Sequence, residues 1–136
     1  MQVNMSEKAN ATGDGVSTSL SRSFTVKEKN TVGFMVPGMP VVATTPYLIG
    51  IAKMTCYEIV EPMLEPSVVA VGTRVAIDHL GASKVGSTLL VDARLRSYEK
   101  NRYCFAATIT DGARTVARIE HVRAAVSVQK LTNTLG

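Results

Sequence analysis

Residues 44–64 read TTPYLIGIAKMTCYEIVEPML, a pattern typical of one long helix with apolar side chains on every face. Thr45 is predicted as the N-cap and Pro46 as the first helical residue, where the missing N–H costs nothing. Pro62 ends the pattern, because a proline disfavours helical dihedrals in the residue before it. The sequence therefore predicts a buried helix over residues 46–61, around which a sheet must wrap.

This helix is predicted to be a core element and not a membrane span. About 20 consecutive apolar residues are needed to cross a bilayer, and Lys53, Glu58 and Glu61 interrupt the run. The N-terminus lacks the charged and apolar segments of a secretion signal. Cys56 falls inside the helix pattern and Cys104 inside a strand pattern. Both are therefore expected to be buried thiols of a reduced protein. We therefore expect a cytoplasmic protein.

The composition indicates a single domain that needs no metal or disulfide to build its core. The chain has 136 residues, which we divide into a polar tail (1–22), one domain (23–131) and a frayed end (132–136). The net charge of +4 comes from Lys and Arg scattered among acids, which does not indicate nucleic-acid binding. The two histidines and two cysteines lie far apart, so no metal site is predicted.

The remaining segments alternate apolar and polar residues with the period of two that is typical of strands. They are residues 23–34, 68–79, 87–98, 102–110 and 113–128. In the second, one face is predicted to carry Val69, Val71, Thr73, Val75, Ile77 and His79. In the third, the inward residues are Leu89, Val91, Ala93 and Leu95. Together they predict an α+β domain, an antiparallel sheet curled around one central helix.

Three features are candidates for chemistry. His79 ends a strand and faces the predicted helix, Thr45 lies at the helix N-terminus, and a Gly-Thr pair stands at Gly72. An imidazole, a hydroxyl and the free amides of a helix end are the parts that acyl transfer uses. The alternative for His79 is a structural histidine with no catalytic role.

The order of three segments resembles the fluoroacetyl-CoA thioesterase-like group of hot-dog-fold proteins over residues 24–131. These are ATTP before the helix, EPSVVAVGTRVAIDHL after it, and EHVR late in the chain. The resemblance implies a hot-dog domain that forms a homodimer or tetramer. It also implies that acyl-CoA binds near the dimer interface, with coenzyme A as part of the substrate and no other cofactor.

The resemblance also implies residue roles. The family uses a threonine, a helix carboxylate and a strand-end histidine, and Thr45 and His79 match the first and the last. Gly72 matches a position where the backbone approaches the substrate. Lys53 stands where the family usually has Glu, which leaves Asp78 and Glu58 as the nearby acids. The other predicted substrate-binding residues are Phe34, Pro46 and Tyr47.

Lys53 and the late basic residues have two interpretations each. The aliphatic stem of Lys53 can lie along the core, or its ammonium can hold a phosphate or an acyl carboxylate. His121 and Arg123 are expected to be structural or to lie at the pocket rim, with the remaining strand arginines facing solvent.

Three functions remain open at this point. The leading hypothesis is an acyl-CoA thioester hydrolase with His79 as base and the helix end at Thr45 as oxyanion site. The alternative is a non-catalytic acyl-CoA or acyl-carrier binding protein, because Lys53 replaces the carboxylate. A hydratase or dehydratase would need the same missing acid.

Overall fold

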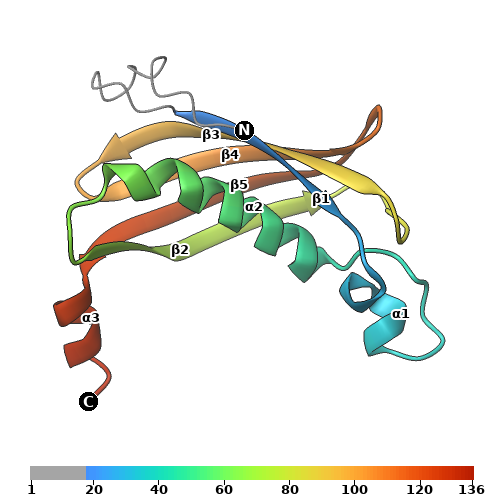
Figure 1. Ribbon diagram of the computed structural model, residues 1–136, viewed down its shortest axis with the longest axis horizontal. Coiled ribbons are helices and arrows are strands. Elements are labelled where there is room, and N and C mark those ends of the chain that lie inside the picture. Colours follow the sequence, from blue (N-terminus) through green and yellow to red (C-terminus); the bar gives the residue numbers. More distant parts are fainter. Residues whose placement is uncertain (1–17) are drawn as a thin grey trace.

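The computed structural model describes residues 18–136 as one antiparallel sheet with a long helix, α2, packed across one face (Figure 1). The strands run in the spatial order β1-β3-β4-β5-β2. Their bounds are Ser19–Thr25 (β1), Val68–His79 (β2), Thr88–Glu99 (β3), Arg102–Asp111 (β4) and Arg114–Ser127 (β5). The predicted sheet wrapped around one central helix is confirmed.

The central helix α2 spans Thr45–Val60, and its N-cap is Thr44. The Thr44 backbone is extended, and its Oγ1 accepts a hydrogen bond from Tyr47 N at 3.1 Å. The predicted N-cap, Thr45, is instead the first helical residue, with Pro46 second. Because Thr44 supplies the cap, the Thr45 hydroxyl is free to bind another partner.

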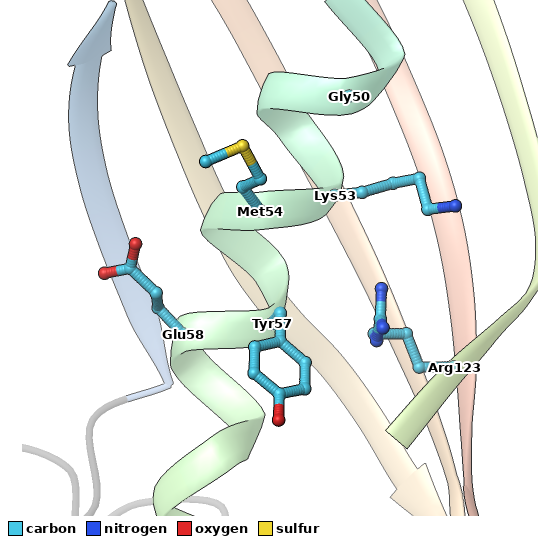
Figure 2. Close-up of a pocket in the computed structure, with 6 residues that line it drawn as sticks. All are labelled: Gly50, Lys53, Met54, Tyr57, Glu58 and Arg123. Atoms are coloured by element: carbon cyan, nitrogen blue, oxygen red, sulfur yellow. The ribbon is translucent and has the colours of Figure 1, made fainter. Parts of the chain in front are cut away.

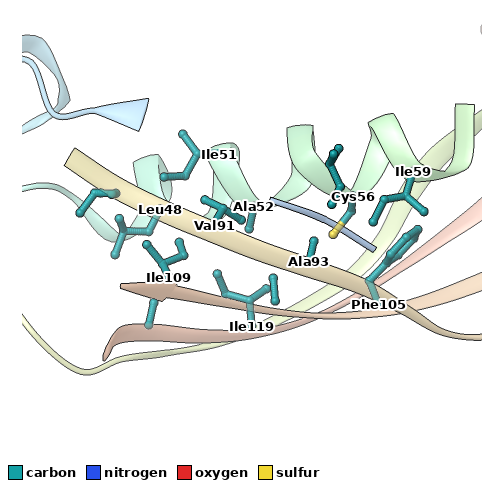
Figure 3. Close-up of a cluster of buried hydrophobic side chains, with 14 of the residues drawn as sticks. Leu48, Ile51, Ala52, Cys56, Ile59, Val91, Ala93, Phe105, Ile109 and Ile119 are labelled. Carbon is teal, nitrogen blue, oxygen red and sulfur yellow. The ribbon is translucent and has the colours of Figure 1, made fainter. Parts of the chain in front are cut away.

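The core lies between the inner face of α2 and the concave side of the sheet (Figure 3). Leu48, Ile51, Ala52, Cys56 and Ile59 of α2 pack there against strand residues that include Val91, Phe105, Ile109 and Ile119. The predicted inward positions of β3 are confirmed, since all four are buried. Each large side chain buried in this way contributes about 1.5–3 kcal/mol.

The N-terminal part of the domain differs from the prediction. Strand β1 begins at Ser19 and ends at Thr25, so the predicted strand over residues 23–34 is wrong beyond its first three residues. Two short helices follow instead, a 3-10 helix at Glu28–Asn30 (η1) and α1 at Val32–Met35. Side-chain caps favour them: Asn30 Oδ1 accepts from Lys27 N, and Thr31 Oγ1 accepts from Phe34 N. Residues 19–22, predicted as tail, belong to the sheet, and residues 1–17 lie outside the described part of the chain.

The C-terminal residues form a short helix, α3, at Val128–Asn133. Its N-cap is Ser127, whose Oγ accepts a hydrogen bond from Lys130 N at 3.0 Å. Residues 132 and 133, predicted as the start of a frayed end, therefore belong to this helix. The division of the chain at residues 23 and 131 stays a prediction.

Strand β2 is an edge strand and carries a bulge between Gly72 and Arg74. The bulge shifts the alternation by one residue, so Ala70 and Ile77 both face the core although they stand an odd number of residues apart. The prediction of one unbroken face over residues 68–79 is wrong for this reason. The chain from Gly72 to Ala76 is exposed.

Within residues 18–136, no helix has both the length and the apolar character needed to cross a membrane. Cys56 and Cys104 are free cysteines, the first buried and the second half-buried. Burial raises the pKa of the Cys56 thiol to about 12, so this thiol is protonated and unreactive at neutral pH.

Candidate functional site

The structure brings the two predicted catalytic side chains together. Thr45 Oγ1, at the start of α2, lies 2.7 Å from His79 Nδ1, at the end of β2. The two residues are 34 positions apart in the chain. In this hydrogen bond the hydroxyl can donate to an unprotonated ring nitrogen, which leaves the ring of the exposed His79 able to accept a proton. A polarised hydroxyl and an accessible base therefore share one end of the helix.

The first turn of α2 offers one unpaired amide. Tyr47 N donates to the Thr44 side chain and Leu48 N donates to the Thr44 carbonyl, while Pro46 has no N–H. Among residues 18–136, Thr45 N–H is then the amide of this turn that has no acceptor. The helix end can thus donate one hydrogen bond to a carbonyl oxygen placed beside Thr45.

The other residues predicted to bind substrate near the N-terminal end of α2 are only partly buried or exposed. Pro46 is exposed, and Tyr47 is half-buried with its hydroxyl 3.5 Å from the Thr25 carbonyl. Burial raises the pKa of Tyr47, so its hydroxyl stays protonated. Phe34 lies on α1, beside the N-terminal end of α2 (Figure 1), and is 62% exposed. Most of its surface is therefore open to solvent.

A second group forms where α2 crosses the middle of β2 and β5. We call Lys53, His121 and Arg123 the basic cluster. An ideal Cβ built on Gly72 would lie 3.1 Å from His121 Cε1 and 3.3 Å from Lys53 Nζ. A side chain at Gly72 would therefore displace the lysine or the histidine. Gly72 and Lys53, both predicted to contact substrate, meet here.

The basic cluster borders an open cavity of about 590 Å³ (Figure 2). Its lining residues are Gly50, Lys53, Met54, Tyr57, Glu58 and Arg123. Figure 2 shows Lys53 and Arg123 on one side of α2 and Glu58 on the other. Glu58 binds Arg22 in an ion pair of 2.5 Å, so its carboxylate does not neutralise the cluster.

His121 is buried and held by two hydrogen bonds. Arg123 Nη1 lies 3.1 Å from His121 Nε2 and can only donate, so Nε2 accepts. Nδ1 then carries the hydrogen and donates to the Arg74 carbonyl at 2.9 Å. Burial lowers the pKa of His121; the bond to the Arg74 carbonyl opposes this, and the charges of Arg123 and Lys53 add to it. His121 is therefore a neutral, structural histidine.

The lowered pKa of His121 makes stability depend on pH. As pH falls from about 7.5 to about 5.5, the unfolded chain takes up a proton at its ordinary histidine pKa, while the folded chain resists it. The folded protein therefore keeps its full free energy of unfolding at pH values above the histidine pKa of the unfolded chain. This free energy decreases as pH falls below that pKa. We expect a lower urea midpoint at the acidic value. His121→Gln should flatten this decrease and His79→Gln should retain it; an unchanged slope in His121→Gln would contradict the assignment.

The Thr45–His79 pair and the basic cluster do not meet within one chain. Gly72 and His79 are seven residues apart on β2, about 23 Å at 3.3 Å per residue. Thr45 and Lys53 are eight residues apart on α2, about 12 Å of helix rise. Among residues 18–136 no carboxylate is hydrogen-bonded to His79: Asp78 is exposed and Glu58 is paired with Arg22. The helix position expected to hold the acid carries Lys53 instead.

The predicted site residues did not include Tyr57. Tyr57 lies under the Arg123 guanidinium, whose carbon is 5.1 Å from the ring centroid, and Met54 lines the same cavity. The spacing between Lys53 and Tyr57 is one helical turn, which places both on one face of α2 and was a usable signal. Within residues 18–136, no three His, Cys, Asp or Glu side chains gather closely enough to hold a metal ion.

Comparisons with known proteins show which family this chain is similar to. The fluoroacetyl-CoA-specific thioesterase family, FlK, matches residues 26–129. The fluoroacetyl-CoA thioesterase of Streptantibioticus cattleyicolor is 28% identical over 124 residues, which are 87% of this chain and 89% of that protein. A solved variant of this type of enzyme, in complex with fluoroacetate and CoA, has a TM-score of 0.77 at 28% identity, covering 83% of this chain and 95% of the other.

A more distant structure shows the fold alone. The hot-dog-like protein from Thermanaerovibrio acidaminovorans superposes with a TM-score of 0.81 at 20% identity, covering 87% of each chain. The predicted hot-dog fold is thereby confirmed. Since the family match spans most of the sequence, the chain belongs to the fluoroacetyl-CoA-specific thioesterase family of hot-dog-fold proteins.

Proposed function

We propose that this protein hydrolyses the thioester of a small or medium acyl-CoA, with Thr45 and His79 at the reacting carbonyl. The observation that carries the proposal is the 2.7 Å contact between the Thr45 hydroxyl and His79 Nδ1 at the N-terminal end of α2. A solved relative with fluoroacetate and CoA bound supports the substrate class.

In the proposed reaction the thioester carbonyl lies against the first turn of α2. The unpaired Thr45 N–H donates to the carbonyl oxygen and stabilises the negative charge that forms there. His79 takes a proton from water or from the Thr45 hydroxyl, and that oxygen attacks the carbonyl carbon. The carbon–sulfur bond then breaks, and the thiolate of coenzyme A receives a proton from His79. Where Thr45 is the attacking group, a water molecule deprotonated by His79 next hydrolyses the acyl ester on Thr45, which releases the acid and restores the hydroxyl.

We also propose that the protein works as a homodimer joined through β2. The strand lies at the sheet edge, with residues 72–76 exposed and the apolar Val75 39% exposed. The β2 strand of a second copy can pair antiparallel with it. This pairing satisfies the free N–H and C=O groups of the edge strand, which otherwise favour aggregation. A two-fold axis near Val75 would place His79 of one copy opposite Gly72 of the other. Thr45 and His79 would then face the second copy's basic cluster across the interface.

The direct test is thiol release from short, aromatic and long acyl-CoA esters. We expect turnover of at least one ester by the dimer. Absence of thiol release from every ester, with a folded dimer in solution, would refute the hydrolase assignment. Light scattering or analytical ultracentrifugation supplies the oligomeric state.

The second candidate is acyl-CoA or acyl-carrier binding without turnover. It is favoured by the missing acid, because no carboxylate in residues 18–136 is hydrogen-bonded to His79. A carboxylate would stabilise protonated His79, whereas the ammonium of Lys53 cannot. Calorimetric binding of coenzyme A esters without thiol release, together with hydrolysis gained in Lys53→Glu, would establish this reading.

A further inference from the structure

The cavity beside α2 carries positive charge that no acid in residues 18–136 neutralises. Lys53 has neither an ion pair nor a hydrogen bond with any side chain there. Arg123 has only neutral partners: His121 Nε2, the Ala70 carbonyl at 2.7 Å and the Tyr57 ring. Glu58, the acid at the cavity wall, is already paired with Arg22. Two cations therefore face one open space without a counter-charge.

The side chains of Arg123 and Lys53 are held in fixed positions by neighbouring groups. Both Arg123 terminal nitrogens are anchored, and its Nε is buried with no hydrogen-bond partner in the described chain. The stem of Lys53 is half-buried, and its ammonium lies beside the bare backbone of Gly72. Orienting the cations before binding reduces the entropy that an anionic ligand must overcome.

The shape of the cavity limits the ligand. Met54 and the Tyr57 ring supply apolar wall, while the charges gather at the side formed by β2 and β5 (Figure 2). This arrangement suits a short apolar chain that ends in an anion. A planar carboxylate fits a lysine and an arginine that approach from two elements.

We propose that the acyl group taken by this protein ends in a carboxylate, so that its substrates are monothioesters of short dicarboxylic acids. The proposal rests on the proposed function, and on the paired β2 edges that would bring one copy's basic cluster to the other copy's His79. Lys53 is the residue that selects the anion. Arg123, anchored behind it, supplies the second positive charge.

The experiment compares two thioethers of equal chain length, S-carboxypropyl-CoA and S-butyl-CoA, which cannot be hydrolysed. Titration calorimetry of the full-length protein is expected to give about 10- to 100-fold tighter binding of the carboxylated ligand, as a hydrogen bond between charged groups supplies. In Lys53→Met the ratio of the two affinities should fall toward one. Lys130→Met, which removes an exposed lysine from α3, is the matched control and should retain the ratio.

The same pair built on pantetheine separates the acyl carboxylate from the phosphates of coenzyme A. The preference should persist there if Lys53 holds the carboxylate. Equal affinity for the two CoA thioethers, no binding of either, or an equal loss for both in Lys53→Met would overturn the proposal. Thiol release is a separate readout: a protein that binds the carboxylated ligand selectively but cleaves no ester would refute hydrolysis and keep the anion site.

Discussion

His79→Ala is expected to lower kcat for the best acyl-CoA ester by about 10²–10⁴-fold, the usual contribution of a positioned general base. The imidazole is the basic side chain that contacts Thr45, and among residues 18–136 no carboxylate is placed to replace it. Because His79 is exposed at the end of β2, its removal leaves the core intact. KM should change little, since the ring acts on the reacting oxygen more than on the coenzyme.

The matched control is Asp78→Ala, the exposed neighbour on β2, which should keep kcat within about twofold because its carboxylate is not hydrogen-bonded to His79. Thermal unfolding of both variants establishes that the fold is retained. Unchanged hydrolysis by His79→Ala on every active ester would show that the base has been assigned wrongly.

Thr45→Ala and Thr44→Ala are expected to separate chemistry from stability. Thr45→Ala removes the hydroxyl bound to His79 and should lower kcat about 10²-fold. It should not destabilise the protein, since alanine is the better helix former. Thr44→Ala removes the N-cap and should cost about 0.5–2 kcal/mol of unfolding free energy while keeping most of the activity.

Urea unfolding and steady-state thiol release on both variants check this pair. A Thr45→Ala protein that is as active as the unmodified chain would exclude a role for the hydroxyl. A Thr44→Ala protein with an unchanged urea midpoint would contradict the assignment of the cap.

Local sequence patterns predict the regular elements of this fold but not the side-chain contacts that distinguish neighbouring residues. The apolar helix and the alternation of β3 follow from the period of their side chains, and both were found as expected. The N-cap did not follow, because adjacent threonines satisfy the same local rule. Only the contact of Thr44 with Tyr47 N and of Thr45 with His79 distinguishes them.

The contacts of the basic cluster with Gly72 were harder to predict, because they depend on the bulge in β2. A strict period of two along residues 68–79 cannot show that Gly72 leaves room for His121 and Lys53, since the extra residue at the bulge redirects the strand. The contact of Arg123 with Tyr57 joins β5 of the sheet to α2, the helix packed on it. No spacing rule relates residues so far apart in the chain.

Lys53 also bears on how specificity can change over evolutionary time. Its side chain is half-buried and has no hydrogen-bond or ion-pair partner in residues 18–136. The stability of the fold therefore depends little on the charge of this side chain. Codons for glutamate and lysine differ by a single base. The sign of the charge that faces the cavity can therefore reverse in one mutational step while the protein remains folded, and a new substrate preference becomes accessible to selection at once.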